Sequence, residues 1–244
     1  MDQATPHSER ILNDEDLAVL EKNANRPPVY AAGSVLVRHG DTTNFVLYLM
    51  AGHVKAMRHD PTDQTKRKAP PRIVAIHGPG EVTCELAAIT GGPRIADVIA
   101  ITPVDALFIP GDVWMSFLDR HPRVMKALYK KSALIQTAMT DVRAESATTA
   151  EQKLAGAFLK LTSTGLGTVS ETDNGQVMSF KDLTQMDLAG LAGISRESTV
   201  QCIKQFKENG ILTTGRRRFT IHDIDVLRRI ADRPDSTPTR REGS

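Results

Sequence analysis

The chain has 244 residues, a formal net charge of +2 and only two cysteines. Its length fits one large domain or two small ones, and the cysteine count excludes a disulfide framework or a cysteine-rich metal site. No apolar run reaches the roughly 18 residues of a membrane span, and the polar start MDQATPHSER is not a signal peptide. We therefore expect a soluble cytoplasmic protein with no membrane partner.

Basic residues are concentrated at the C-terminal end. Residues 196–244 contain eleven Lys or Arg against seven Asp or Glu. A local excess of positive charge of this kind suggests a polyanionic partner.

The first 110 residues predict a short helix followed by a β-rich region. LNDEDLAVLEKNA indicates a helix that Asn13 caps. Over residues 30–110, short β-type runs such as SVLVRHGD and RIVAIHGPGE alternate with Gly and Pro turns. This pattern is typical of an antiparallel sandwich or barrel. The segment DPTDQTKRKAPP between two runs predicts a charged hairpin loop.

A heptad pattern follows in VMKALYKKSALIQTAMTDVRAES. Its seam residues recur at alternating spacings of three and four, which predicts a narrow stripe on a long helix. Such a stripe packs either on its own β-domain or on a second helix, and we expect homodimerisation. The predicted seam consists of Met125, Leu128, Ser132, Ile135, Met139 and Val142.

The segment from residue 184 to residue 221 has the signals of a winged helix-turn-helix. Thr184 with Asp187 forms a capping box, Gly193 permits a sharp turn, and Ser195 caps a second helix. That helix should bury Cys202, Ile203 and Phe206 and end at Asn209-Gly210. The following ILTTGRRRFTI predicts a two-stranded wing with a basic tip.

The start of the second helix carries side chains that can read double-stranded DNA. Arg196 suits guanine, Glu197 suits cytosine, and Gln201 suits adenine. Residues suited to phosphate contacts surround them, namely Ser195, Ser198, Lys204, Arg216, Arg217 and Arg218. The alternatives are a plain helical hairpin and a ligand-binding module that docks a protein partner. An enzyme is not expected, because no P-loop, nucleophile elbow or metal pair occurs.

The sequence resembles the cyclic AMP receptor protein/fumarate–nitrate regulator (Crp/Fnr) family of bacterial transcription factors. The matching segments are LAGLAGISRESTVQCIKQFKENGIL, YAAGSVLVRHGDTTNFVLYLMAGHVKAM and the cassette around CELAAITGGPRIA. The resemblance implies an α+β protein with a cyclic-nucleotide-binding-type β-roll, a long central dimerisation helix and a C-terminal winged helix-turn-helix. The expected boundaries are a flexible tail at 1–11, the roll at 12–120, the dimerisation helix at 121–147, the DNA-binding domain at 148–232 and a disordered tail at 233–244.

The resemblance also assigns an effector cassette. Arg94 would hold a cyclic phosphate and Glu85 a ribose hydroxyl, with backbone N–H groups of Glu85, Leu86 and Ala87 nearby. A hydroxyl of the central helix, Thr140 or Thr137, would supply a third contact to the effector. Two positions depart from the family pattern: Cys84 replaces a glycine, and Ile95 replaces a Ser or Thr that touches phosphate.

These residues leave the effector open. Cyclic AMP or cyclic GMP is one candidate, and an empty roll closed by a Glu85–Arg94 ion pair is another. Redox sensing by Cys84 beside Arg94 is a third. No cofactor or metal is required, since the seven histidines are scattered. RNA polymerase is a further candidate partner.

Overall fold

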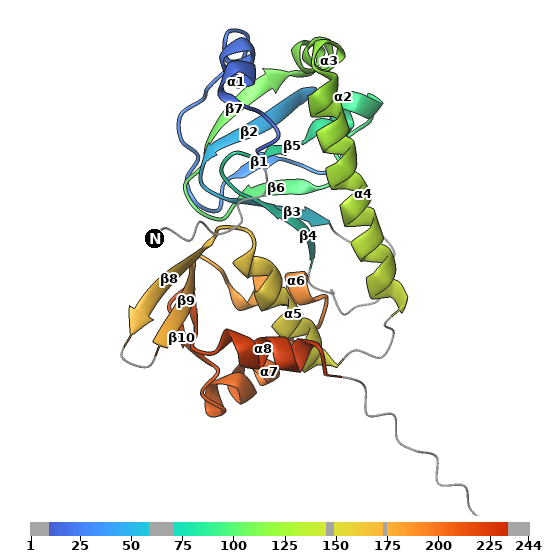
Figure 1. Cartoon of the computed structure of the whole chain (residues 1–244). Coiled ribbons are helices and arrows are strands. Elements are labelled where there is room, and N and C mark those ends of the chain that lie inside the picture. Colours follow the sequence, from blue (N-terminus) through green and yellow to red (C-terminus); the bar gives the residue numbers. More distant parts are fainter. Residues whose placement is uncertain (1–9, 59–70, 145–148, 173–174, 234–244) are drawn as a thin grey trace, which may run out of the picture.

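The protein consists of a β-rich half and a helix-rich half, with a long helix running alongside (Figure 1). The computed structural model describes residues 10–58, 71–144, 149–172 and 175–233. Within these ranges, the side chains of residues 134–144 are not described. The predicted charged loop and both predicted tails therefore lie largely outside the described residues.

The β-rich half is a roll of two antiparallel sheets. One sheet has the strand order β1-β6-β3-β4 and the other β5-β2-β7. The first contains β1 (Val35–Val37), β6 (Asp97–Ala100), β3 (Val54–Arg58) and β4 (Arg72–His77). The second contains β5 (Val82–Thr83), β2 (Phe45–Ala51) and β7 (Asp105–Pro110). The antiparallel β architecture expected from the sequence is confirmed.

Strand β2 is buried on both faces because it separates two cores. Leu47 and Leu49 face the interior of the roll, where they pack with Val54 and Val98. Val46 and Tyr48 point the other way, into a core shared with the helices around the roll. Alternate side chains of a strand lie on opposite faces, so the continuous apolar run FVLYLM supplies both cores from one strand.

Helices cover the outer face of the second sheet. α1 (Asp14–Glu21) is capped by Asn13, as predicted, with Asp16 completing a capping box. α2 (Glu85–Thr90) and α3 (Gly111–Arg120) were not predicted, and Trp114 and Phe117 of α3 are fully buried. α4 (Pro122–Ala144) is the long central helix.

Over residues 149–172 and 175–233, the C-terminal half combines four helices with a four-stranded antiparallel sheet of order β10-β11-β9-β8. Its elements are α5 (Ala150–Thr162), β8 (Gly167–Thr172), β9 (Gly175–Lys181), α6 (Gln185–Ala192), α7 (Arg196–Glu208), β10 (Leu212–Gly215), β11 (Arg218–Ile221) and α8 (Ile224–Ala231). The predicted two-stranded wing was too small: β9 pairs with β11 and extends it. The hairpin β8–β9 and helix α8 were missed.

The local signals of the helix-turn-helix are confirmed. Thr184 and Asp187 form the capping box of α6, and Gly193 ends that helix with φ +64°. Ser195 caps α7, whose Cys202, Ile203 and Phe206 are buried. These three side chains share a core with Phe158, Phe180 and Phe219.

The two halves pack against one another. Lys55 of β3 and Asp187 of α6 form an ion pair at 2.5 Å, with side chains 16% and 6% exposed. Gly190 lies against the roll, since a Cβ there would come within 2.5 Å of the carbonyl oxygen of Pro71. His53 Nε2 lies 3.1 Å from the carbonyl oxygen of Thr164. The first helix of the helix-turn-helix is thus docked on the edge strand β4, as Figure 1 also shows.

Candidate effector cassette and DNA-binding face

Arg94 is held inside the roll rather than presented to solvent. Only 3% of the surface of Arg94 is exposed to solvent. Nε donates to Thr43 Oγ1 at 3.2 Å, and the two terminal nitrogens donate to the carbonyl oxygens of Cys84 at 2.9 Å and Phe45 at 2.7 Å. The guanidinium also lies 4.5 Å from the centre of the Phe45 ring. Arg94 therefore connects the loop before β2, the cassette turn at Cys84 and the first residue of β2 through its hydrogen bonds.

Cys84 adopts a backbone conformation that glycine takes without strain. It is the N-cap of α2, with φ +70° and ψ 10°. A residue with a Cβ in this left-handed region is strained by about 1–2 kcal/mol. The family resemblance leads us to expect a glycine at this position, and glycine adopts such a left-handed conformation without strain.

The Cys84 thiol is poorly suited to redox sensing. Burial raises its pKa to about 11, although nearby Arg94 lowers the pKa in part. The thiolate is the reactive form, and at neutral pH this thiol stays protonated. The redox alternative is therefore not supported.

The remaining predicted effector residues lie on or beside the cassette helix, and none of them is among the three hydrogen-bond acceptors of Arg94 given above. Leu86 is 45% exposed and Ile95 is 53% exposed, whereas Ala87 is buried. Glu85 begins α2 and is half-buried. All three hydrogen bonds of Arg94 given above go to uncharged oxygens, so within the described residues the predicted Glu85–Arg94 ion pair is not formed. The side chains of Thr137 and Thr140 lie outside the described residues.

One residue of the predicted dimer seam on the central helix, Leu128, is buried within its own protomer. Leu128 is only 7% exposed because it packs with Trp114 and Phe117 on its own roll. The exposed stripe is instead formed by Met125, 37% exposed, and Tyr129, 77% exposed, one turn later. Ser132 is also exposed. The other predicted seam residues, Ile135, Met139 and Val142, have side chains outside the description.

Glu81 of the roll forms an ion pair with the central helix α4. Glu81 Oε2 accepts from Lys131 Nζ of α4 at 2.7 Å and lies 3.1 Å from His77 Nδ1. These contacts hold the pKa of Glu81 at about 2, against the opposing effect of burial.

This low pKa predicts acid sensitivity. Because the folded-state pKa lies below the unfolded value of 4.5, ionised Glu81 stabilises the fold above pH 4.5, and this contribution is lost as the pH falls toward 2. The free energy of unfolding of the wild type should fall between pH 6 and pH 3 by about 2 kcal/mol more than that of Glu81→Gln, because the variant has no carboxylate to protonate at this position. Urea unfolding of the wild type and of Glu81→Gln at pH 6 and pH 3 measures this difference. Equal pH dependence would contradict the assignment.

The outer face of α7 presents the predicted base-reading residues together. Arg196, Glu197 and Gln201 are exposed, while Thr199 on the opposite face is fully buried. A groove of about 660 Å³ runs along this surface. It is lined by Arg196, Glu197, Val200, Gln201, Lys204, Gln205 and Glu208. Val200 was not among the predicted contacts.

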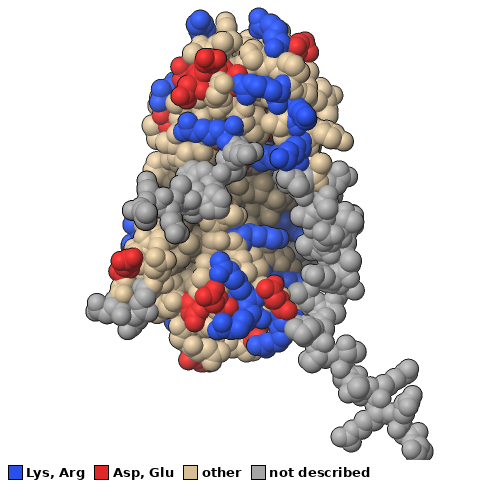
Figure 2. Space-filling view, in the orientation of Figure 1, with Lys and Arg blue, Asp and Glu red and all other residues tan. Residues whose placement is uncertain are grey.

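The predicted phosphate-contacting residues flank this face. Ser195 accepts from the backbone N–H of Ser198 at 3.1 Å, which fixes the start of α7. On the wing, Arg216 and Arg218 are exposed. Arg217 is also exposed, but its guanidinium already donates a hydrogen bond to the carbonyl oxygen of Asp182 at 3.1 Å, and its backbone has φ +52°. Figure 2 shows basic and acidic side chains mixed over this lower end of the molecule.

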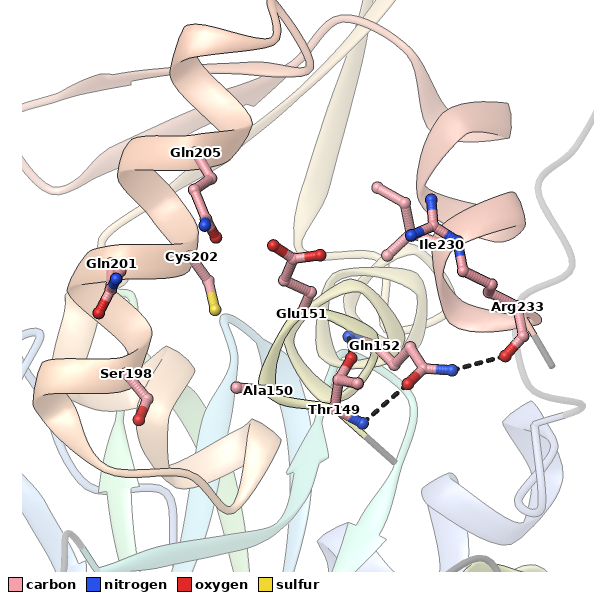
Figure 3. A pocket seen from close by; sticks show the side chains of 10 residues that line it. All are labelled: Thr149, Ala150, Glu151, Gln152, Ser198, Gln201, Cys202, Gln205, Ile230 and Arg233. Atoms are coloured by element: carbon pink, nitrogen blue, oxygen red, sulfur yellow. Dashed lines mark hydrogen bonds between the residues drawn. The ribbon is translucent and has the colours of Figure 1, made fainter. Parts of the chain in front are cut away.

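A second pocket of about 380 Å³ lies behind α7, between α5 and α8. Figure 3 shows Cys202 and Gln205 of α7 facing Glu151 of α5 across it. Gln152 closes one end, because its Nε2 donates to the carbonyl oxygen of Arg233 at 2.6 Å. Gln201 lines both this pocket and the outer groove, so it lies at the boundary between the two surfaces.

Metal and membrane sites find no support in the described part of the chain. No group of three or more His, Cys, Asp or Glu side chains there could hold a metal ion. None of the helices in the same ranges is long and apolar enough to span a membrane.

The fold, a β-roll followed by a winged helix-turn-helix, is that of a DNA-binding transcription regulator. A family model described as a cyclic nucleotide-binding domain matches residues 27–121, and one described as a Crp-like helix-turn-helix domain matches residues 152–230. The chain belongs to the Crp/Fnr family of transcription regulators. The predicted family and α+β fold class are thereby confirmed.

Relatives align over most of their length. The cyclic AMP receptor protein of Thermus thermophilus is 25% identical over 83% of this chain and 87% of its own. The CRP-like cAMP-activated global transcriptional regulator of Mycobacterium tuberculosis is 25% identical over 88% and 92%. The c-di-GMP responsive global regulator of Xanthomonas campestris shares the fold, with a TM-score of 0.70 at 16% identity, covering 86% of this chain and 100% of that one. The family consists of transcriptional regulators, not enzymes, as predicted.

Proposed function

We propose that this chain acts as a homodimer that binds a two-fold symmetric DNA site through α7 and the wing, under the control of the roll. The observation that supports the proposal is that the α7 side chains suited to reading bases are exposed together, above an inner face that is buried. This is the arrangement by which a recognition helix enters the major groove. We further propose that the protein works in the cytoplasm and engages RNA polymerase, as the family resemblance implies.

Arg196 is expected to read one base pair of each half-site. Arg196→Ala should weaken specific binding by about 1–3 kcal/mol per half-site and relax the preference at that position, because a bidentate contact to guanine is lost. Binding-site selection with both proteins measures it. Arg229, an exposed residue of α8 outside the groove, provides the control variant Arg229→Ala. An unchanged selected motif would remove Arg196 as a reader.

The exposed stripe of α4 is the proposed dimer surface. Met125 and Tyr129 lie one turn apart and are not covered by the roll. A large exposed aromatic residue beside a methionine is typical of an interface centre. The proposed partner is still a second copy of this chain, as predicted from the sequence. The contact, however, is made by Tyr129 and not by Leu128, because Leu128 is buried within its own protomer.

Tyr129→Glu should therefore raise the dimer dissociation constant at least tenfold, because it places a charge against its symmetry mate. Sedimentation equilibrium at micromolar concentration measures the change. Lys130→Glu is the matched control, since Lys130 is exposed and lies about 100° further around the helix. A wild-type chain that sediments as a monomer, or equal dissociation of both variants, would contradict the dimer surface.

For the roll, we propose a cyclic nucleotide, cyclic AMP or cyclic GMP, as the effector, with Arg94 on the phosphate and Glu85 on the ribose. The match to the cyclic nucleotide-binding domain and the two relatives named for cyclic AMP support this proposal. The buried contacts of Arg94 mean that a phosphate has to draw the guanidinium away from the carbonyl oxygens of Cys84 and Phe45.

The same contacts favour a second candidate, a roll that Arg94 closes permanently. Calorimetry with each nucleotide separates the two. Heat of binding that is lost in Glu85→Gln supports the nucleotide. The absence of heat at millimolar ligand assigns Arg94 a purely structural role and leaves the DNA-binding proposal intact.

A further inference from the structure

The outer face of α7 contains one aliphatic residue among polar ones. Val200 is 44% exposed, and the six other residues that line the groove are polar or charged. A β-branched residue is not favoured at an exposed helix position. The core of this half is made by the opposite face of α7, where Thr199, Cys202 and Ile203 are buried. Neither packing nor helix propensity therefore explains a valine at this position.

Val200 lies where a recognition helix meets base edges. Residues four apart share one face of a helix, so Val200 falls in the row between Arg196 and Lys204. The two basic side chains flank it along the exposed surface. A side chain in that row faces the floor of the major groove whenever Arg196 reaches a base.

We propose that Val200 reads the C5-methyl group of a thymine. Apolar contact with this methyl group is how an aliphatic side chain distinguishes thymine from the other bases in the major groove. Val200 has no donor or acceptor with which to read a base in any other way. The proposal rests on α7 being the DNA-reading helix, and it adds a specificity determinant to that function.

The geometry also places the thymine. Four residues of α-helix rise about 6 Å, and stacked base pairs are about 3.4 Å apart. The thymine should therefore lie within about two base pairs of the guanine contacted by Arg196, once in each half-site.

The test removes only the methyl group. Binding sites are selected from random duplexes with the full chain, and each thymine of the selected site is then replaced by deoxyuridine. We expect one symmetric pair of positions at which deoxyuridine weakens wild-type binding about fourfold per half-site, as loss of one buried methyl group predicts. At a cytosine placed there instead, 5-methylation should strengthen binding by a similar factor.

The variant Val200→Ala should lose most of this discrimination while binding the deoxyuridine site as well as the wild type does. Alanine favours helix, and a thermal unfolding curve verifies that the variant is folded. Val169→Ala is the matched control, because Val169 is 51% exposed on β8, the strand farthest from β10 in the same sheet. It should retain the wild-type discrimination.

Two results overturn the proposal: deoxyuridine tolerated at every thymine, or a Val200→Ala variant that discriminates as the wild type does. Failure to select any site would instead contradict DNA reading by α7, so the two failures are distinguishable.

Discussion

Replacing Arg94 with methionine is expected to lower the free energy of unfolding by about 3–5 kcal/mol. The substitution removes the donors to the carbonyl oxygens of Cys84 and Phe45 and the contact with Thr43. It also removes the guanidinium from the Phe45 ring, worth roughly another 0.5–1 kcal/mol. Methionine fills a similar volume, so the loss is chiefly polar. Urea unfolding followed by circular dichroism measures it.

The neighbouring Ile95→Thr provides the matched control. Ile95 is 53% exposed, so the stability should change by less than about 0.5 kcal/mol. Threonine there also restores the hydroxyl found in the family pattern, which makes this variant useful in the nucleotide titration. If Arg94→Met were as stable as the wild type, the buried contacts would contribute nothing, and the guanidinium would be free to bind an anion without loss.

The sequence predicted elements whose signals are local. The caps at Asn13, Thr184 and Ser195 depend on residues within one turn, and all three form as expected. The burial of Cys202, Ile203 and Phe206 also follows from helical spacing alone. The confirmed helix-turn-helix needed no information from distant parts of the chain.

The missed features depend on contacts between distant segments. Arg94 was expected to face a ligand, but its acceptors include Phe45, 49 residues away. Leu128 fits a heptad pattern, yet the roll covers it. The cross-strand pairing of β9 with β11 joins Phe180 to Phe219, which no local pattern in the segment before α6 indicates. Val200 carried a usable signal, an aliphatic residue one turn after Arg196, that sequence reasoning overlooked.

The docking of the two halves offers a route by which the roll can control DNA binding. The first helix of the helix-turn-helix rests on β4 of the roll, with the ion pair between Lys55 and Asp187 at its edge. If an effector binds as proposed and rearranges the cassette, it would change the roll against which α6 packs. Because α6 and α7 share one core, movement of α6 would then reorient the proposed DNA-reading face of α7. Coupling of this kind requires a difference in free energy between docked and released arrangements.

Lys55→Met is expected to shift the equilibrium toward the arrangement in which α6 is not docked on β4. Breaking a largely buried ion pair costs about 3 kcal/mol when one charge is left behind. Asp187 still accepts from the backbone N–H and the hydroxyl of Thr184, so the cap of α6 is preserved. Changing Lys55 instead of Asp187 therefore loosens the docking without damaging the helix.

We expect Lys55→Met to lower the free energy of unfolding by about 3 kcal/mol and to raise DNA affinity without effector at least threefold. Arg228→Met is the matched control, because Arg228 and Asp225 form an exposed pair within α8, with side chains 60% and 68% exposed. Exposed pairs of this kind contribute at most about 1 kcal/mol. Loss of stability in Lys55→Met with unchanged DNA affinity would show that the docked contact supports the fold but does not transmit a signal. A change in both would make the surface between β4 and α6 the element whose position the effector has to alter.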